Sequence, residues 1–248
     1  MARALRFFLI FLVSIVLGCG PIPRIEPPTP DPPYGGVVFV QSGSTTICSG
    51  CTQQNFQVTL PNVGDGDTAK VVVWWFSSYQ VGNNIVQPPN PVVTDSANSA
   101  YSLITSGPNC CSPSQMGYMF STPSVSSGGN DVTFTIRLPF PTQNLIFVVV
   151  LEYSGGGTLD GQANWVDTFG PSPATSAPVT VTGQDVVISL YFGSLFGTTA
   201  CATCNLRFVG SSEFVVQDFF PTGTGSMQAQ FSNTNRAGLY AVGAASFQ

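Results

Sequence analysis

Six cysteines form three close pairs whose spacing could support metal binding or redox chemistry: Cys48 with Cys51, Cys201 with Cys204, and Cys110 next to Cys111. Four thiolates from two C-x-x-C pairs can hold zinc or an iron–sulfur cluster. The two C-x-x-C motifs, however, lie far apart in the chain, unlike the compact motifs of zinc ribbons. A thioredoxin-like role requires a βαβ setting, for which the sequence gives no signal.

Disulfides are therefore the predicted state of these six cysteines, and no metal or cofactor is expected. Three bridges would suit an oxidising compartment outside the cytosol. Adjacent Cys110 and Cys111 can pair with each other only through a strained ring, so bridges to other loops are equally open. Six cysteines allow fifteen connectivities, and the sequence does not choose among them.

The chain contains no histidine, which removes the usual catalytic triads and zinc-hydrolase sites. Two carboxylates could still run glycoside hydrolysis. Glu152 and Glu213 are available, but nothing in their spacing brings two carboxylates together. We therefore predict no catalytic residues. Glu152, between Leu151 and Tyr153 at a strand end, is either a functional carboxylate or a structural acceptor for backbone donors.

The segment GDGD at 64–67 could supply oxygen ligands to calcium. The further ligands of a calcium loop are not evident. A tight turn into the strand that begins near Thr68 is the favoured interpretation.

Four aromatic residues, Trp74, Trp75, Tyr79 and Trp165, could stack against sugar rings if they were exposed. Trp74 and Trp75 are adjacent in a predicted strand and must face opposite sides, so at least one belongs to the core. Trp75, Tyr79 and Trp165 are the candidate glycan-stacking residues.

The N-terminus predicts export and lipid attachment. Arg3 and Arg6 precede an apolar run from Phe7 to Leu17, which has the form of a secretory signal and is too short to span a bilayer. The residues 16–19 (VLGC) resemble the lipobox of bacterial lipoproteins, although this family favours leucine three places before the cysteine and a small residue two before. The resemblance implies cleavage after Gly18 and acylation of Cys19. The alternative is an ordinary secretory signal that leaves Cys19 free or bridged.

Two further features agree with that interpretation. Assigning Cys19 to lipid leaves an even number of the seven cysteines for disulfides. Gly20 follows the cysteine, where an aspartate would favour inner-membrane retention in enteric lipoproteins. The outer membrane or cell surface is therefore the expected location.

A proline-rich linker separates the predicted anchor from the folded part. Seven of the seventeen residues 20–36 are proline, which favours an extended polyproline II path. At about 3.1 Å per residue, the linker could hold a domain roughly 50 Å from the lipid. The predicted organisation is a signal peptide (1–18), a lipid-anchored linker (19–36) and one folded domain (37–248).

The sequence of the folded part predicts β-strands throughout. In 54–60 (QNFQVTL) and 131–138 (DVTFTIRL) apolar and polar residues alternate, as they do in 226–231 (SMQAQF) with Met227, Ala229 and Phe231. The runs 70–76 (KVVVWWF) and 144–153 (NLIFVVVLEY) are apolar on both faces, which is typical of strands covered from both sides. Turn signals separate these runs. The prediction is an all-β, single two-sheet antiparallel sandwich, jelly-roll-like, and the alternative is two smaller immunoglobulin-like sandwiches with a boundary near 169–178.

Four segments, DTAKVVV, VVTDSANSAY (92–101), VVVLEYSG (148–155) and GLYAVGAASF, resemble an exported β-sandwich module of environmental bacteria. Its copies carry a T-D-S-x-x-N-x-Y turn and an L-E-Y-S-G strand end, in the same order over most of 54–248. The resemblance implies the fold and no activity. Ala100 departs from the usual threonine, and the cysteine pairs look like local additions. Asp95 and Asn98 suit a hairpin turn, because their side chains can cap local backbone groups.

Composition limits the partners. The net charge is −5 and charged residues make up 8% of the chain, so nucleic acid and anionic membrane surfaces are poor partners. The expected function is a structural or adhesive role at the cell surface without catalysis, anchored to the membrane through the lipid on Cys19. Partners would be envelope glycans or other surface proteins. The alternative is a surface lectin that resembles a carbohydrate-binding module.

Overall fold

A computed structural model describes residues 36–46, 52–76, 80–81, 84–85, 87–109, 112–161, 164–171, 173–193, 199–200, 203–211, 214–232 and 237–248. The predicted signal peptide, Cys19 and nearly all of the linker lie outside these ranges, so their roles stay predictions. The described residues form strands, turns and bends, with no helix among them. Consequently, no helix within those ranges is long and apolar enough to cross a membrane.

The first half of the folded part forms two antiparallel sheets. The inner N-terminal sheet has five strands in the order β1-β10-β3-β8-β7: β1 (Val38–Thr46), β10 (Ile146–Ser154), β3 (Thr68–Phe76), β8 (Ser112–Thr122) and β7 (Ser102–Asn109). The outer N-terminal sheet has three, in the order β2-β9-β6: β2 (Gln53–Leu60), β9 (Val132–Thr142) and β6 (Val92–Asp95). A small hairpin pairs β4 (Gln80–Val81) with β5 (Asn84–Ile85).

The second half repeats this plan with different topology. The inner C-terminal sheet runs in the order β11-β20-β14-β17-β16: β11 (Asn164–Pro171), β20 (Ala237–Phe247), β14 (Val186–Gly193), β17 (Phe214–Phe219) and β16 (Asn205–Ser211). Two small sheets cover its outer side. One contains β12 (Ala174–Thr175), β19 (Gln230–Ser232) and β15 (Thr199–Ala200), and the other contains β13 (Val179–Val181) and β18 (Gly225–Met227).

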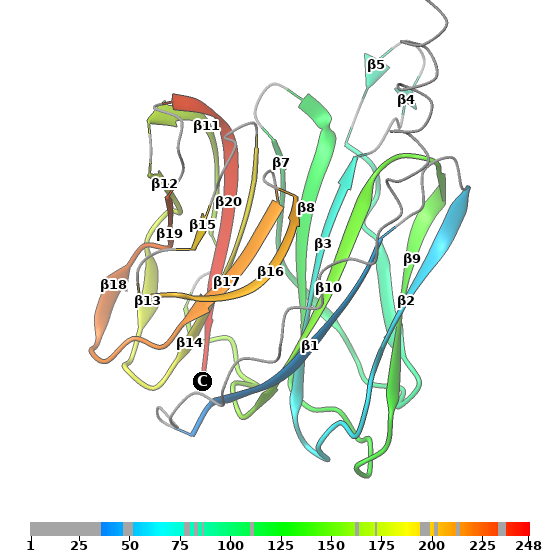
Figure 1. Cartoon of the computed structure of the whole chain (residues 1–248), viewed down its shortest axis with the longest axis vertical. Coiled ribbons are helices and arrows are strands. Elements are labelled where there is room, and N and C mark those ends of the chain that lie inside the picture. Colours follow the sequence, from blue (N-terminus) through cyan, green and yellow to red (C-terminus); the bar gives the residue numbers. More distant parts are fainter. Residues whose placement is uncertain are drawn as a thin grey trace, which may run out of the picture.

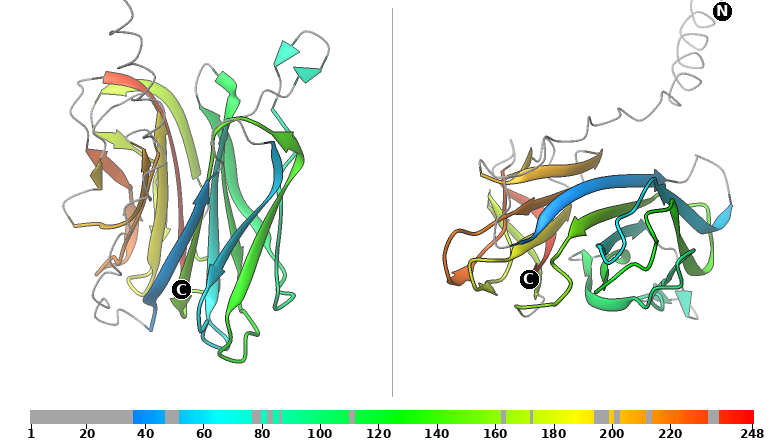
Figure 2. Two further views of the ribbon diagram at one scale, coloured as in Figure 1. Left: turned by 45° about the vertical axis from the view of Figure 1, so that its right-hand side comes forward. Right: turned by 90° about the horizontal axis from the view of Figure 1, so that it is seen from below.

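The sheets stack in layers, from β12, β13, β18 and β19 on the left of Figure 1 to β2 and β9 on the right. The same stack is seen after a 45° turn in the left view of Figure 2. Three separate clusters of buried apolar side chains fill the spaces between layers. The first lies within the N-terminal pair of sheets, the second joins the two inner sheets, and the third lies within the C-terminal half.

Strand β3 shows why the inner sheets are apolar on both faces. Val71, Val73 and Trp75 belong to the first cluster, whereas Val72 and Trp74 belong to the second. Alternate side chains of a strand point to opposite faces, so a strand between two layers needs apolar residues at every position. The prediction that 70–76 and 144–153 are covered from both sides is confirmed.

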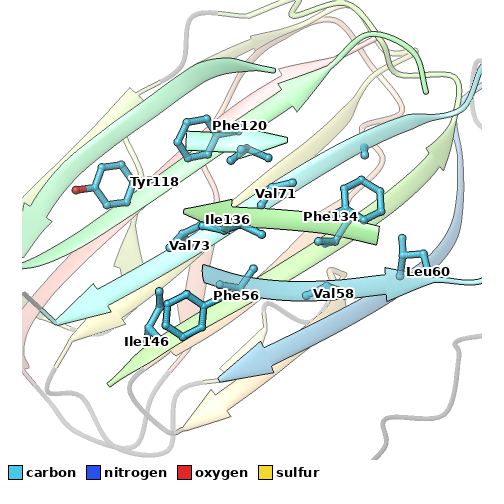
Figure 3. Packing of buried hydrophobic residues seen from close by; sticks show 14 of the residues in the cluster. Phe56, Val58, Leu60, Val71, Val73, Tyr118, Phe120, Phe134, Ile136 and Ile146 are labelled. Carbon is cyan, nitrogen blue, oxygen red and sulfur yellow. The ribbon is translucent and has the colours of Figure 1, made fainter. Parts of the chain in front are cut away.

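The first cluster follows the predicted alternation closely. Phe56 and Val58 of β2 and Phe134 and Ile136 of β9 point across the layer toward Val71 and Val73 of β3 (Figure 3). Their neighbours in sequence, including Gln57 and Thr135, point outward. Each fully buried Val, Ile or Phe contributes roughly 1.5–3 kcal/mol relative to an exposed one. Burial of these side chains therefore sets the register of the outer sheet.

The all-β antiparallel sandwich predicted from the sequence is confirmed, and the structure adds layers to the expected two sheets. Each half pairs an inner with an outer layer, and the chain passes from one half to the other between β10 and β11 rather than near 169–178. The SMQAQF segment divides between β18 and β19, in two different small sheets. Alternation shows that a strand face is buried, but it does not show which sheet covers it.

Candidate functional site

The predicted thiol and lipid sites fall mostly outside the described residues. Cys19, Cys48, Cys51, Cys110, Cys111 and Cys201 lie there, as do Tyr79 and Glu213. Cys204 is disulfide-bonded. The connectivity of the six cysteines stays a prediction. Among the described residues, no group of three or more His, Cys, Asp or Glu side chains could hold a metal ion.

Trp75 is not a glycan-stacking residue. Its side chain is fully buried in the first cluster, with its ring centroid 5.1 Å from that of Phe140. Trp74 is also buried, on the opposite face of β3, and stacks with Phe147 and Phe214. The sequence predicted that at least one of the two tryptophans is core. The structure buries both, because β3 has a layer on each side.

Trp165 is a packing residue between the two halves. Its indole lies against three glycines, Gly107 of β7, Gly117 of β8 and Gly243 of β20, at each of which a Cβ atom would overlap the ring. The Trp165 indole N–H donates to the carbonyl oxygen of Pro108 (3.0 Å), and its ring packs on Phe192. The half-buried ring thus packs β11 against β7, β8 and β20, and its predicted role in sugar stacking stays a prediction.

Glu152 is a buried structural acceptor that ties three segments together. The Gly64 N–H donates to Glu152 Oε1 (2.9 Å), and the Gln41 amide donates to Oε2 (2.6 Å). The same Gln41 amide donates to the carbonyl oxygen of Pro61 (2.7 Å). Burial raises the pKa of Glu152 to about 7, and the hydrogen bond and charge of Asp67 raise it too, whereas the Gly64 and Gln41 bonds act in the opposite direction. Of the two interpretations of Glu152, the structure supports the acceptor of backbone donors.

The GDGD segment forms the tight turn predicted for it. The Asp67 N–H donates to the carbonyl oxygen of Gly64 (3.1 Å), and Gly66 has a φ of 86°, which favours glycine. The Asp65 carboxylate accepts a bond from the Gly128 N–H (3.1 Å), which links this turn to the loop before β9. The two aspartates thus serve the local fold.

The turn after β6 is held by the side chain of Asp95 and by the backbone angle of Asn98. Asp95 Oδ1 accepts from the Ser99 N–H (3.0 Å), and Oδ2 accepts from the Tyr101 hydroxyl (2.7 Å). Asn98 has a φ of 60°, a conformation that asparagine tolerates better than most residues. Burial raises the pKa of Tyr101, and Asp95 adds to this rise. The predicted turn role of Asp95 and Asn98 is confirmed.

A buried ion pair between the halves was not predicted from the sequence. Arg207 Nε donates to Asp218 Oδ2 (2.6 Å), which also accepts from the Tyr153 hydroxyl (2.6 Å). The guanidinium lies 3.6 Å from the ring centroid of Phe39 on β1. Burial raises the pKa of Asp218, and Arg207 is the strongest opposing influence. The network connects β16 and β17 to β10 and β1.

Lys70, the only lysine of the chain, is a second buried cation between the halves. Its ammonium donates to Ser121 Oγ and to the carbonyl oxygen of Gly156, both at 2.7 Å. It also lies 4.0 Å from the ring centroid of Phe247 at the end of β20. Burial lowers the pKa of Lys70 to about 7. The sequence did not indicate this placement, because an isolated lysine in a mostly apolar strand does not show what surrounds it.

A small hollow of about 150 Å³ lies in the C-terminal half, lined by Thr203, Cys204, Phe219, Gln228 and Gln230. Pockets that enclose small-molecule ligands commonly measure 300–1,000 Å³. This hollow is too small for such a ligand.

The outward side of the outer N-terminal sheet carries a regular set of mostly uncharged polar side chains, here called the polar face, which also includes one arginine and one valine. It comprises Asn55, Gln57 and Thr59 on β2, Thr133, Thr135 and Arg137 on β9, and Val92, Thr94 and Ser96 on or next to β6. All nine are exposed or half-buried. Sequence reasoning used the buried partners of these residues and overlooked the outward ones, although the same alternation defines both sets.

No protein-family model, curated protein or solved structure matches this chain. The resemblance to an exported β-sandwich module therefore stays a prediction.

Proposed function

We propose that this protein is a lipid-anchored surface protein of the bacterial envelope with a structural or adhesive role and no catalytic activity. Its acylated Cys19 holds it in the membrane, and its linker carries the stacked sheets away from the bilayer. Nucleic acid is not a partner, because the chain has a net charge of −5. The six remaining cysteines form three disulfides, each of which adds about 2–4 kcal/mol of stability.

The observation that supports this proposal is the use of the ionisable side chains. Lys70, Arg207, Asp218 and Glu152 are buried, and each is hydrogen-bonded to groups that hold neighbouring strands together. These four charged groups thus connect strands within the stack, while the outer sheet presents mostly neutral polar side chains. This distribution suits a rigid scaffold with a contact surface.

Intact mass spectrometry of the native protein, before and after reduction, tests the anchor and the bridges together. The expected mass begins at Cys19, carries acyl chains and rises by six hydrogens on reduction. The Cys19→Ser variant should keep its leader and lose the acyl mass. A native mass that begins at Met1 would contradict the localisation.

Attachment of cells tests the adhesive role. Cells of a strain that lacks the protein should attach less to polysaccharide-coated surfaces or to one another, and the wild-type gene should restore attachment. The Cys19→Ser variant should not restore it, because the domain is then not displayed. Equal attachment with and without the gene would leave only the structural role.

A second candidate is a surface lectin, which the polar face favours and the tryptophans do not. Trp75 is buried and Trp165 packs against three glycines, so neither tryptophan presents a fully exposed ring for sugar stacking. Hydroxyl and amide groups on the polar face are instead the available partners for sugar hydroxyls.

A further inference from the structure

The polar face is a grid whose rows are fixed by strand register. Gln57 of β2 and Thr94 of β6 both lie opposite Thr135 of β9 and form its middle row. In the next row, Thr59 pairs with Thr133, and Ser96 exchanges hydrogen bonds with Thr133 on the other side. Neighbouring strands are about 4.8 Å apart and same-face residues about 6.8 Å apart along a strand. The groups therefore repeat in two directions.

The grid is supported from beneath by the first cluster. Val58 and Phe134, whose side chains alternate with those of the grid, are 4% and 0% exposed. The hydroxyls of Thr59 and Thr133 are hydrogen-bonded to each other (2.9 Å). A hydroxyl has one donor and two acceptor positions, so each retains capacity for an external partner. The face can thus bind without first becoming ordered, which limits the entropic cost of association.

The charge of the grid is distinctive in a chain of net charge −5. It carries one cation, Arg137, and no acid. The nearest acids are hydrogen-bonded to other groups: Asp95 is buried against Tyr101, and the exposed Asp131, just before β9, accepts a bond from the Asn62 N–H. One cation does not neutralise a phosphate backbone or an anionic bilayer. Partner chemistry must therefore be neutral and rich in hydrogen-bonding groups.

The composition of the grid also argues against a protein partner. Protein interfaces have an apolar centre enriched in aromatic residues. The grid has no aromatic side chain, and its one large apolar residue, Val92, lies on the edge strand β6, in the outermost row. Neutral hydroxyl and amide groups in a flat array match the hydroxyls of an uncharged polysaccharide.

We propose that the polar face of β2, β9 and β6 binds neutral polysaccharide. This inference rests on the adhesive function proposed above and names its partner. Without aromatic stacking, each contact is weak, and useful binding comes from many lipid-anchored copies on one surface. Thr135, in the middle row of the central strand, is the residue whose replacement tests the face most directly.

The experiment uses the full-length lipidated protein on phosphatidylcholine vesicles. Co-flotation with vesicles is measured first and reports the anchor alone. Retention of the vesicles is then measured on insoluble cellulose, chitin, xylan, β-1,3-glucan and mannan. Wild-type vesicles should be retained on at least one of these polymers, and soluble protein without vesicles should be retained at least tenfold less.

Thr135→Glu places a charge and added bulk at the centre of the grid and should reduce retention at least tenfold. Thr135→Ser keeps the hydroxyl and should bind like the wild type. Thr180→Glu is the matched control, because Thr180 is an exposed threonine on a different strand, β13. The melting temperatures of all three variants verify folding.

Three results would overturn the inference. Co-flotation of the protein with vesicles that bind none of the polymers would refute the polysaccharide partner and leave the anchor intact. Retention of Thr135→Glu vesicles equal to that of the wild type would refute the polar face as the binding surface. Self-association in light scattering that Thr135→Glu abolishes would assign the face to contacts between copies.

Discussion

Replacement of the buried Lys70 by methionine should remove a steep dependence of stability on pH. The folded protein lowers the pKa of Lys70 from 10.5 to about 7, so between these values the unfolded chain binds one more proton than the folded one. Stability then rises with pH across this window and is flat below it. At 1.36 kcal/mol per pKa unit, the full rise is about 5 kcal/mol, of which about 3 kcal/mol falls between pH 6 and pH 9.5.

The measurement is the free energy of unfolding in urea at several pH values from 6 to 9.5, for the wild type and Lys70→Met. The difference between the two proteins isolates Lys70, because other titrating groups contribute equally to both. At pH 6 methionine relieves a buried charge but leaves Ser121 Oγ and the Gly156 carbonyl without their donor. The free energy of unfolding of the variant should therefore be close to that of the wild type at pH 6 and about 3 kcal/mol below it at pH 9.5.

Lysine NMR provides an independent check. Because Lys70 is the only lysine, ¹³C-labelled lysine gives a single side-chain resonance whose shift reports its protonation. A midpoint near pH 7 is expected in the folded protein and near 10.5 in urea. A difference in unfolding free energy that stays constant from pH 6 to pH 9.5, together with a midpoint above 10 in the folded protein, would refute the reasoning.

Three further substitutions test the other buried contacts. Glu152→Gln should flatten the dependence of protein stability on pH between 4.5 and 7. The Glu152 pKa is raised to about 7 in the folded protein, so its stabilising contribution is present below pH 4.5 and is lost as the pH rises. Melting temperatures at pH 5 and pH 8 measure this change. Asp218→Asn should cost about 3–5 kcal/mol of unfolding free energy in urea, since it leaves Arg207 buried without its counter-charge. Gly117→Ala should cost about 1–3 kcal/mol, because the new methyl group overlaps two rings; Gly223→Ala, with open space around it, should cost under about 1 kcal/mol in the same assay.

For each of these substitutions, one outcome would contradict the prediction. The Glu152 account fails if the variant and the wild type show the same change in melting temperature between pH 5 and pH 8. For the ion pair, Asp167→Asn is an exposed control that should change stability by less than about 0.5 kcal/mol, and equal effects of Asp218→Asn and Asp167→Asn would contradict a buried charge pair. Equal effects of the two glycine substitutions would contradict close packing around position 117.

The strands and local turns could be predicted because their signals are local. Phe56, Val58 and Leu60 alternate with polar residues, and all three lie in the first cluster. Asp95 and Asn98 form the predicted turn because their hydrogen bonds and backbone angles involve only near neighbours. These features follow from the period of a strand and from side chains that cap adjacent backbone groups.

The roles of the candidate site residues could not be predicted in the same way. Trp165 was expected to be exposed, and three glycines from strands distant in sequence form the surface on which it packs. Trp75 was expected to stack on sugars, and a sheet on each side of β3 buries it. Whether an aromatic ring faces solvent depends on what covers it, which a strand pattern does not contain.

The sequence by itself determined that the protein is built of antiparallel β-strands, which faces of those strands are apolar, and where several turns lie. Only the tertiary structure decided that the sheets stack in more than two layers, that Lys70 and the Arg207–Asp218 pair are enclosed between the halves, and that neutral groups on three strands form one face. The physical reason is the sequence distance over which each interaction acts. Strand periodicity and turn formation depend on a few neighbouring residues, whereas the burial of a side chain and the composition of a surface depend on strands brought together from all parts of the chain.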